Sequence, residues 1–479
     1  MVNASIAEIA QIVGGRIHGV NNPGASVSGA VSIDTRTLRE GDIFAAFVGE
    51  RVDGHDYVPV ALEKGASLVL STREVAAPSI VVPDMLEALT VLARELLRRE
   101  RSRRHDLTVL AVTGSAGKTS TKDLLGELCA TSGETIAPAG SFNNELGLPL
   151  TVLGINETTR FLVLEMGARG IGHIAHLTDI APPDISLALN IGSAHAGEFG
   201  GIEFTQRAKS EIISALSPAG RAILNATDPR VRAMADVSAA PVIFWGDTDS
   251  PVRAENVTLN EAGAPGFELI VEPGMTTLQG EEISPYRGHV QLSLLGKHQV
   301  ANALAAVAAA LVAGVSAQNA VEVLAKAQPR SRYRMEVSER SDGVTIINDA
   351  YNANPDSMRA ALETLSHLGK ERRTVAVLGT MLELGEESAE EHRKIGREAA
   401  DLGVSLLLSV GSREIYEGAL EVTGYAERTL YAPDNDAARD ILETTVKPGD
   451  VVLFKSSHGA RLFTLGESLA TLMDGETEE

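Results

Sequence analysis

A short glycine loop stands between an apolar stretch and a helical one, in residues 107–119 with the sequence LTVLAVTGSAGKT. Its glycines let backbone N–H groups turn inward, and the following helix directs the positive end of its dipole at the loop, which favours phosphate. Lys118 adds a mobile positive charge, and Thr119 adds a hydroxyl that suits Mg²⁺. The sequence therefore predicts that a nucleoside triphosphate binds at Gly114, Ser115, Ala116, Gly117, Lys118, Thr119 and Ser120.

The loop departs from a full Walker A motif, because Val112 stands where that motif has glycine. We interpret it as a shorter variant. The alternative is an ordinary strand-to-helix turn with a surface lysine, and the order of strand, glycine loop and helix argues against that alternative. The loop alone does not identify the group that receives the γ-phosphate.

Two further side chains with metal-binding chemistry come directly after predicted strands. Glu165 follows the apolar stretch FLVL, and His195 follows ISLALNIG. Ligands of open α/β sheets gather at the carboxyl ends of the strands, so we expect both side chains near the glycine loop. There they can coordinate metal ions that bridge the phosphates and the reacting group. Taken singly, Glu165 also fits a strand-end cap and His195 a core histidine.

Three polar residues of the same region give weaker signals. Lys209, in RAKSEII, fits a solvated helix position. Asn143 and Asn144, in SFNNELGLP, fit a polar turn before a proline. A buried asparagine pair beside the glycine loop would instead orient a substrate, so both interpretations stay open.

The string NDAYNANPDS, residues 348–357, is the most unusual in the chain. It offers several hydrogen-bonding side chains and one stacking ring directly after an apolar strand, which suits a nucleoside better than a simple turn requires. Upstream, SRYRMEV places Arg332 and Arg334 at a domain junction. An arginine delivered from a junction can neutralise charge in phosphoryl transfer.

Composition excludes several classes of protein. A net charge of −22 argues against a nucleic-acid partner. Cys129 is the one cysteine, so there is no disulfide framework or multi-cysteine zinc site, and we expect this thiol to pack inside the helix after the glycine loop. The alanine-rich segment 300–315 is too short to span a bilayer comfortably and predicts a buried helix. Because the N-terminus does not resemble a signal peptide, we expect a cytoplasmic protein without membrane insertion.

The 479 residues predict an α/β protein of three domains. Residues 1–106 hold short strands and helices and end in a basic run, residues 98–105, that we interpret as a solvated hinge. Residues 107–336 form a central phosphate-loop domain with a mostly parallel sheet and, within 252–295, an antiparallel excursion. Residues 337–479 form a Rossmann-like domain, although GTMLELG after its second strand is not the dinucleotide fingerprint.

Taken together, these residues resemble those of the Mur ligases, the ATP-dependent amide-forming enzymes of peptidoglycan precursor synthesis. The resemblance covers nearly the whole chain and is carried by TGSAGKTSTK, EMGARGIGHI, NIGSAH, AKSEI, GKHQVANALAA and INDAYNANPDSM. The last string is the most specific. It resembles the members that join D-alanyl-D-alanine to a UDP-N-acetylmuramoyl-tripeptide through an acyl phosphate, and these two molecules are the partners that the resemblance implies.

The resemblance assigns roles around the triphosphate. It implies that Lys118 holds the β and γ phosphates, that Thr119 and Glu165 bind one Mg²⁺, and that His195 binds a second. Lys209 matches the family lysine that is carbamylated, a role invisible in the bare sequence. By the same resemblance, the nucleotide contacts Asn302 and Arg334, the ribose contacts Asp349, and the ATP and dipeptide side is lined by Tyr351 and Asn354.

Both ends of the chain carry family strings. SIDTRTLREGDIFAAFVGERVDGHDYV is similar to the uridine-nucleotide binding part of the family, so the candidates for holding the UDP end are Asp34, Thr35, Arg36, Asp53 and His55. Near the C-terminus, FKSSHGARLF departs from the usual K-G-S-R string. Lys455 and Ser457 match it, but its arginine falls on His458, which leaves the contact to the dipeptide carboxylate open between Arg461 and another arrangement.

Two other functions remain as alternatives. One is a sister ligase that adds a single amino acid to the same nucleotide peptide. The other is a phosphate-loop regulatory ATPase that binds partners and makes no amide bond, which would not require the N-terminal DTR and DGH strings. We expect the chain to act as a monomer.

Overall fold

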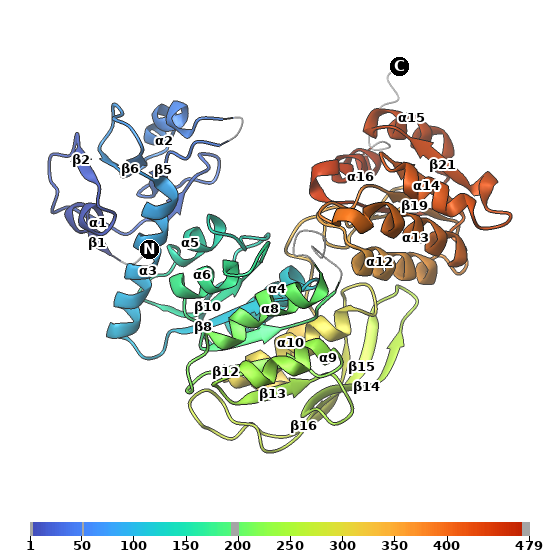
Figure 1. Cartoon of the computed structure of the whole chain (residues 1–479), viewed down its shortest axis with the longest axis horizontal. Coiled ribbons are helices and arrows are strands. Elements are labelled where there is room, and N and C mark those ends of the chain that lie inside the picture. The colour runs from blue at the N-terminus through green and yellow to red at the C-terminus, as the bar shows by residue number, and fades with distance from the viewer. Residues whose placement is uncertain (1–2, 50–51, 193–200, 472–479) are drawn as a thin grey trace.

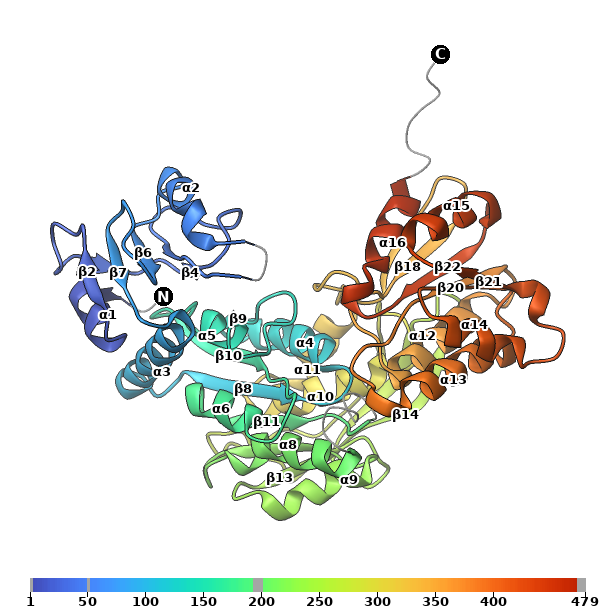
Figure 2. The same cartoon turned by 45° about the horizontal axis from the view of Figure 1, so that its top comes forward.

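The computed structural model describes residues 3–49, 52–192 and 201–471. Figure 1 shows three α/β units in chain order, with an N-terminal unit in blue, a central unit in cyan to yellow and a C-terminal unit in orange to red, and Figure 2 shows the same arrangement from a second side. Each unit has its own main sheet. The predicted α/β class is confirmed.

The N-terminal unit is built on a five-stranded sheet with the order β2-β7-β6-β5-β4, parallel except for β2. The long helix α3 leads from it to the central unit. Its elements are β1 (Ala4–Ser5), α1 (Ile6–Ile12), β2 (Arg16–His18), β3 (Ser26–Val27), β4 (Val31–Ser32), β5 (Ile43–Ala45), η1 (Gly54–Tyr57), α2 (Val58–Glu63), β6 (Leu68–Ser71), β7 (Ser79–Val81) and α3 (Met85–Arg103).

The central unit is built on a nine-stranded sheet with the order β16-β15-β14-β13-β12-β11-β8-β10-β9. Its elements are β8 (Thr108–Thr113), α4 (Lys118–Ala130), β9 (Glu134–Ile136), α5 (Gly147–Val152), β10 (Thr159–Glu165), α6 (His173–Ile180), β11 (Ile185–Ala188), α8 (Ile202–Ser214), β12 (Arg221–Asn225), α9 (Pro229–Arg232), η2 (Ala233–Val237), β13 (Val242–Trp245), β14 (Val252–Leu259), β15 (Pro265–Val271), β16 (Tyr286–Gln291), α10 (Gln299–Val312) and α11 (Ala317–Leu324).

The first strand of this unit, β8, lies between β10 and β11 and runs parallel to both. It is buried along its whole length, and its four central residues are apolar, as expected for a strand covered on both faces. The strands that follow β8 in the chain lie on both sides of it, with β9 and β10 on one side and β11 on the other. The carboxyl end of β8 is therefore the topological switch point, the place where open α/β sheets bind ligands. The glycine loop begins there. The predicted antiparallel excursion is also confirmed, since β14, β15 and β16 pair antiparallel.

Helices cover both faces of the central sheet. Buried residues of α4, α10 and α11 form the core on one face, and α5, α6 and α8 join the core on the other, which continues into α3 and the N-terminal sheet. The alanine-rich segment is the buried helix that the sequence predicts. Cys129 lies on α4 with its side chain buried in the core, as predicted, and burial raises the pKa of its thiol to about 12. Among the described residues, no helix is long and apolar enough to cross a membrane.

The C-terminal unit has a six-stranded sheet with the order β17-β18-β22-β19-β20-β21, parallel except for β17. Its elements are β17 (Glu336–Glu339), β18 (Thr345–Asn348), α12 (Pro355–Leu368), β19 (Thr374–Leu378), η3 (Gly385–Glu387), α13 (Ser388–Asp401), β20 (Leu406–Val410), α14 (Arg413–Leu420), η4 (Ala426–Arg428), β21 (Thr429–Ala432), α15 (Asn435–Thr445), β22 (Val451–Lys455), η5 (His458–Ala460) and α16 (Leu462–Thr471).

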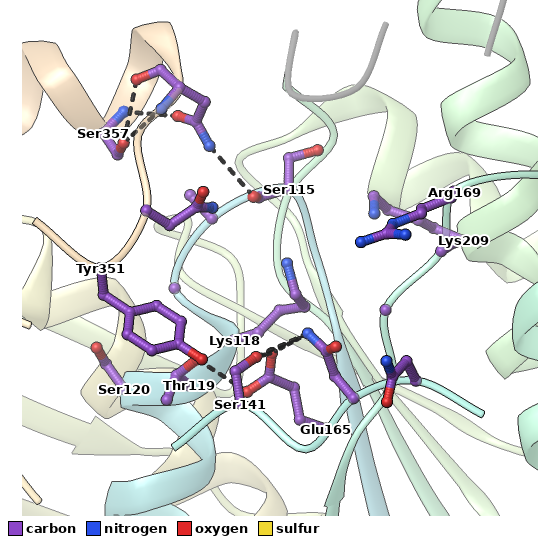
Figure 3. A pocket seen from close by; sticks show the side chains of 18 of the residues that line it. Ser115, Lys118, Thr119, Ser120, Ser141, Glu165, Arg169, Lys209, Tyr351 and Ser357 are labelled. Carbon is purple, nitrogen blue, oxygen red and sulfur yellow. Dashed lines mark hydrogen bonds between the residues drawn. The ribbon is translucent and has the colours of Figure 1, made fainter. Parts of the chain in front are cut away.

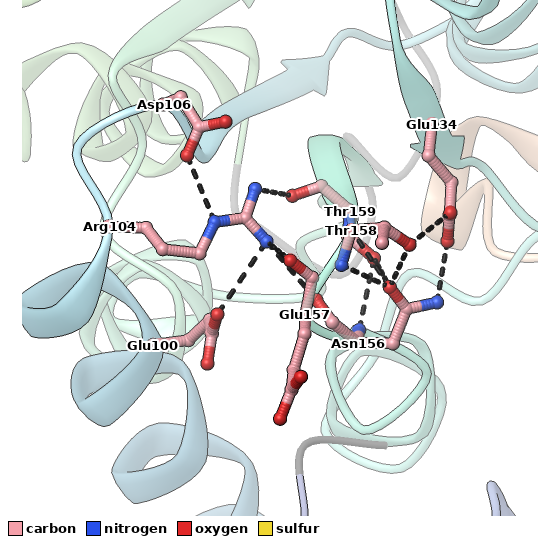
Figure 4. Close-up of polar contacts among 8 residues, drawn as sticks. All are labelled: Glu100, Arg104, Asp106, Glu134, Asn156, Glu157, Thr158 and Thr159. Carbon is pink, nitrogen blue, oxygen red and sulfur yellow. Dashed lines mark hydrogen bonds and ion pairs between the residues drawn. The ribbon is translucent and has the colours of Figure 1, made fainter.

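The interpretation of the basic run 98–105 as a solvated hinge is wrong. Most of the run is the last part of α3, and two of its arginines bond the central unit. Arg101 donates to the carbonyl oxygen of Pro182 at 2.7 Å, and Arg104 donates to that of Thr159 at 2.8 Å, as Figure 4 shows for Arg104. Glu100 is buried beside Arg104. Guanidinium groups carry several donors each, so carbonyl oxygens of the central unit order a run that composition alone describes as exposed.

Candidate functional site

A cavity of about 1060 Å³ lies where the three units meet, at the carboxyl end of β8. The N-terminal unit contributes Asp84, which caps α3, and Glu87 in the first turn of that helix. The central unit contributes the glycine loop, the loop after β10 and the start of α10, and the C-terminal unit contributes residues of the NDAYNANPDS string. Figure 3 shows side chains of the glycine loop, of the loop after β10 and of the NDAYNANPDS string around one space.

The glycine loop is held by the loop that follows the neighbouring strand β11. The backbone N–H of Ser115 donates to the carbonyl oxygen of Asn190 at 3.0 Å, and that of Ala116 donates to its side-chain oxygen at 2.8 Å. Asn190 in turn donates to the carbonyl oxygen of Ala116 at 3.1 Å. These reciprocal bonds fix the loop in a preorganised shape.

The loop passes into α4 at Gly117, which has a left-handed φ of 81°. A Cβ there would lie 2.4 Å from the side-chain oxygen of Asn302, so only glycine fits this junction. The Lys118 ammonium bends back over the loop and donates to the carbonyl oxygen of Gly114 at 2.8 Å. Burial lowers the pKa of Lys118. The negative charge of a bound phosphate would raise this pKa again.

Glu165 is buried at the end of β10 and accepts three side-chain hydrogen bonds. Thr119 donates to its Oε2 at 2.8 Å, and Ser141 and Asn143 donate to its Oε1 at 2.7 and 2.8 Å (Figure 3). Thr119 and Glu165 thus place two hard oxygen donors side by side next to the phosphate loop. This donor set fits Mg²⁺, which takes one or two protein oxygens and completes its shell with phosphate and water.

A second metal position is not visible in the described part of the chain. His195 lies outside the described residues, so its predicted role stays a prediction. Within residues 3–49, 52–192 and 201–471, no three His, Cys, Asp or Glu side chains gather as a metal cluster.

Lys209 is buried, which corrects the interpretation of it as a solvated helix residue. It lies on the face of α8 that packs against the sheet, and it is only 1% exposed. Among the described residues its ammonium makes no hydrogen bond or ion pair. Burial first, and the charge of Lys118 second, lower its pKa to about 7. Figure 3 shows it beside Arg169 at the edge of the cavity.

Arg334 and Asn354 connect the C-terminal unit to the glycine loop and α4. The guanidinium of Arg334 lies 4.5 Å from the ring centre of Tyr351, and its Nη2 donates to the hydroxyl of Thr119 at 3.3 Å. Asn354 caps the N-terminus of α12 and donates through Nδ2 to the carbonyl oxygen of Ser115 at 3.4 Å. Arg334, Tyr351 and Asn354, three of the residues assigned to the nucleotide and dipeptide side, therefore line the cavity beside the phosphate loop.

Asp349 and Lys455 form a buried ion pair with 2.5 Å between Oδ2 and Nζ. The other contacts of the Lys455 ammonium go to the carbonyl oxygens of Asp349 and Asn352, at 3.4 and 3.1 Å. These partners occupy all three of its donors, so in this structure Lys455 holds the NDAYNANPDS string in place. Ser457 accepts from the backbone N–H of Leu382 and does not line the cavity.

The asparagines of the site differ in burial. Asn302 is buried against the glycine loop and accepts from the hydroxyl of Thr121 at 3.4 Å. Asn143 is half-buried and bonds Glu165. Asn144 is exposed, and its side-chain oxygen accepts from the backbone N–H of Gly147 at 2.8 Å. Of the two interpretations, Asn144 fits the polar turn before the proline, and the two asparagines do not form a buried pair.

The residues predicted to hold the UDP end lie in the N-terminal unit and do not line this cavity. Arg36 is exposed and pairs with Asp34 at 2.7 Å, and both flank Thr35 after β4. Asp53 and His55 form a second cluster, in which the His55 ring lies 2.6 Å from the Asp53 carboxylate. The two pairs form polar sites apart from the phosphate loop.

Several cavity residues were missed by the sequence reasoning. Asn190 follows β11, so the strand-end argument that found Glu165 would have found it as well. Arg169 lies four residues beyond Glu165 in the same loop. His298 precedes α10, and burial lowers the pKa of its ring. Glu383 comes from a loop of the C-terminal unit, and no local pattern marks it.

Comparisons with known proteins match all three units. Residues 26–103 match the catalytic domain of the Mur ligase family, residues 112–310 its middle domain and residues 333–458 its glutamate ligase domain. The UDP-N-acetylmuramoyl-tripeptide–D-alanyl-D-alanine ligase of Mycobacterium tuberculosis is 41% identical over 98% of each chain. The enzyme of the same name from Bacillus subtilis is 33% identical over 96% of this chain and 97% of the relative.

Solved structures agree with this relationship. A crystal structure of MurF from Acinetobacter baumannii is similar with a TM-score of 0.80 and 31% identity, over 98% of this chain and 99% of that chain. MurF ligase from Thermotoga maritima, solved in complex with ADP, gives a TM-score of 0.74 and 30% identity over 93% and 98%. From its site, its three units and these relatives, the chain belongs to the Mur ligase family of ATP-dependent amide ligases.

Proposed function

We propose that this enzyme joins D-alanyl-D-alanine to UDP-N-acetylmuramoyl-tripeptide in peptidoglycan precursor synthesis, with ATP as the energy source. The observation that carries the proposal is one cavity in which the phosphate loop of the central unit meets the NDAYNANPDS string of the C-terminal unit. Relatives named for this reaction align over nearly the whole chain.

ATP is needed because a free carboxylate has a poor leaving group and a weakly electrophilic carbon. The tripeptide carboxylate attacks the γ-phosphorus, which gives an acyl phosphate and ADP. The dipeptide amine, after losing a proton, attacks the acyl carbon, the amide bond forms and phosphate leaves. Lys118 and Arg334 face the position of the transferred phosphoryl group from two units and offset its charge.

Thr119 and Glu165 would hold Mg²⁺, since their oxygens lie together beside the loop. When bound, the ion supplies positive charge to the phosphate oxygens. We assign a second ion to His195 and to a carbamate on Lys209. A pKa of about 7 leaves much of the Lys209 amine unprotonated at neutral pH, and the unprotonated amine is the form that reacts with carbon dioxide. The carbamate would replace a buried positive charge by an anion that can ligate or orient ligands of the ion.

The remaining contacts divide among the units. We assign the nucleotide to Asn302, Arg334, Asp349 and Tyr351, and the dipeptide side to Asn354 and the segment held by Lys455 and Ser457. The UDP end is assigned to the N-terminal unit, at Asp34, Thr35, Arg36, Asp53 and His55, where exposed arginine and turn backbone groups suit a diphosphate. Asn143 and Asn144 would border the tripeptide at the loop after β9.

We propose that one chain suffices for the reaction, because all three of its own units line the cavity. Size-exclusion chromatography with light scattering tests this monomer. We place the reaction in the cytoplasm, where ATP and nucleotide-linked sugars are made. Fractionation of the producing cells tests that location.

The proposal is tested by phosphate release with UDP-N-acetylmuramoyl-tripeptide, in the presence and absence of D-alanyl-D-alanine. We expect release and a new amide product only when both are present. Turnover with single amino acids instead of the dipeptide would indicate the sister ligase. Phosphate release without any UDP-linked substrate would indicate a regulatory ATPase, and either result overturns the proposal.

A further inference from the structure

The segment that joins the central and C-terminal units is fixed to the central unit at Ser331. This residue lies between α11 and β17 and is 4% exposed. Its hydroxyl donates to Oδ2 of Asp123 at 2.6 Å and accepts from the backbone N–H of Gly140 at 2.9 Å. Both partners belong to the central unit, so Ser331 moves with that unit.

Two residues later the same segment is fixed to the C-terminal unit. The hydroxyl of Tyr333 donates to Glu467 at 2.7 Å, its ring stacks on Phe463 at 4.7 Å, and its carbonyl oxygen accepts from the backbone N–H of Tyr351 at 3.2 Å. All of these partners lie in the C-terminal unit. The chain therefore passes from one unit to the other within residues 331–333, and Arg332 between them is largely exposed.

The backbone on the C-terminal side of this crossing has an uncommon shape. Tyr333 and Met335 have φ values of 59° and 54°, in the left-handed region that large side chains rarely adopt. Met335 is held there because its backbone N–H donates to Oδ1 of Asp349 at 3.1 Å. Arg334 lies between these two residues, so it belongs to the C-terminal unit, and its contact with Thr119 depends on how that unit is held against the central unit.

The anchor at Ser331 belongs to the same polar network as the phosphate loop. Asp123 lies on α4, five residues after Lys118, and its Oδ1 pairs with the buried ammonium of Lys122 at 2.8 Å. Lys122 also donates to the carbonyl oxygen of Gly140 at 2.9 Å. Gly140 directly precedes Ser141, which bonds Glu165. One network thus joins the helix that receives phosphate, the segment beside Glu165 and the start of the crossing.

We propose that the Ser331–Asp123 hydrogen bond is a positioning contact that sets the angle at which the C-terminal unit closes, and so places Arg334 at the transferred phosphoryl group. Ser331 and Asp123 themselves need not touch a substrate. The activity that the contact supports rests on the proposed function. The closure that it directs is a property of the fold and can be measured without turnover.

The test uses Ser331→Ala, with Ser331→Thr as the variant that restores a hydroxyl. Ser250→Ala is the matched control, because Ser250 is also buried in the central unit and donates to Asp247 at 2.6 Å, away from the cavity. Closure is followed by energy transfer between dyes on Asn319→Cys and Asp436→Cys, which lie on exposed positions of α11 and α15. The native Cys129 is buried, so it does not compete for the dyes.

We expect a non-hydrolysable ATP analogue with UDP-N-acetylmuramoyl-tripeptide to change energy transfer in the parent protein and in Ser250→Ala. In Ser331→Ala the change should shrink and kcat should fall about 10-fold, as expected for losing a hydrogen bond to a carboxylate, with KM for ATP within about twofold. Ser331→Thr should recover most of both losses. The proposal is overturned if the parent shows no closure signal, if Ser331→Ala matches Ser250→Ala in closure and kcat, or if kcat falls while closure is unchanged. A parent that closes but makes no amide would contradict the proposed function and leave the closure comparison intact.

Discussion

The hydroxyl oxygen of Thr119 lies 2.8 Å from Oε2 of Glu165, although the two residues are 46 positions apart. Thr119 lies in the first turn of the helix after β8 and Glu165 ends the neighbouring strand β10, so the pair exists because those strands are adjacent. An oxygen pair at this edge of the sheet, beside a phosphate loop, is suited to hold a divalent cation between protein and triphosphate. The charge of Glu165 should therefore determine how well that cation binds.

Glu165→Gln keeps the shape of the side chain and removes its charge. We expect kcat to fall by at least about 10²-fold and the Mg²⁺ concentration for half-maximal rate to rise, because a neutral amide is a weak cation ligand. Glu339→Gln is the control, since Glu339 accepts from Thr345 at 2.7 Å outside the cavity. Steady-state rates across a Mg²⁺ titration check the prediction. An unchanged Mg²⁺ dependence would remove Glu165 from the metal site.

Lys118→Ala tests the phosphate loop. We expect kcat to fall by at least about 10²-fold, the range for losing one preorganised charge at a transition state. Stability should hardly change, because the ammonium bonds only the carbonyl oxygen of Gly114 in its own loop and is disfavoured by burial. Ligase assays and thermal melts should be compared with those of the exposed-site variant Lys326→Ala. Near-normal turnover would sink the phosphate-loop assignment.

Lys209→Met separates a stability effect from a catalytic one. Burial lowers the pKa of Lys209 from 10.5 to about 7, so between these pH values the unfolded chain binds more protons than the folded one. The free energy of unfolding should therefore rise with pH over this range, and below it the buried charge destabilises the fold fully. Replacing the charge by methionine should stabilise the protein at pH 6 by at least about 1 kcal/mol while ligase activity falls by at least about 10²-fold.

The measurement is denaturant unfolding at pH 6, 8 and 10 in buffer freed of carbon dioxide, which keeps the amine unmodified. The variant should show a shallower pH dependence than the parent. Lys370→Met, at an exposed position, should change neither stability nor activity. Restoring bicarbonate should raise the activity of the parent alone. A variant that is less stable than the parent at pH 6 would show that Lys209 has a structural partner.

The sequence predicted those parts of the site that local pattern determines. Strand, glycine loop and helix follow one another directly, and Glu165 stands at a strand end, so both were placed without knowledge of the fold. The NDAYNANPDS string was found by its composition and by its place directly after an apolar strand. Family resemblance added Asn302 and Arg334, and both line the cavity.

Other features could not be predicted, because they depend on residues far apart in the chain. Lys455 meets Asp349 across 106 positions, and Ser331 meets Asp123 across 208. Lys209 looked solvated because its helix is polar overall, and only the packing of α8 against β11 turns it inward. Composition also misled for the basic run, because Arg101 and Arg104 bond backbone carbonyl oxygens of the central unit, which carry no sequence signal.

A mutation of Arg104 tests whether the basic run is ordered against the central unit. Its guanidinium donates to the carbonyl oxygens of Thr159 and Glu157 and to Asp106, and so ties the end of α3 to the central unit. Arg104→Ala should lower the free energy of unfolding by about 1–3 kcal/mol, because it leaves these acceptors without their donor. Arg103→Ala removes the same charge one residue earlier, at an exposed position, and should cost less than about 0.5 kcal/mol. Denaturant unfolding measures both. Equal losses would mean that charge alone matters and that the end of α3 is a solvated hinge after all.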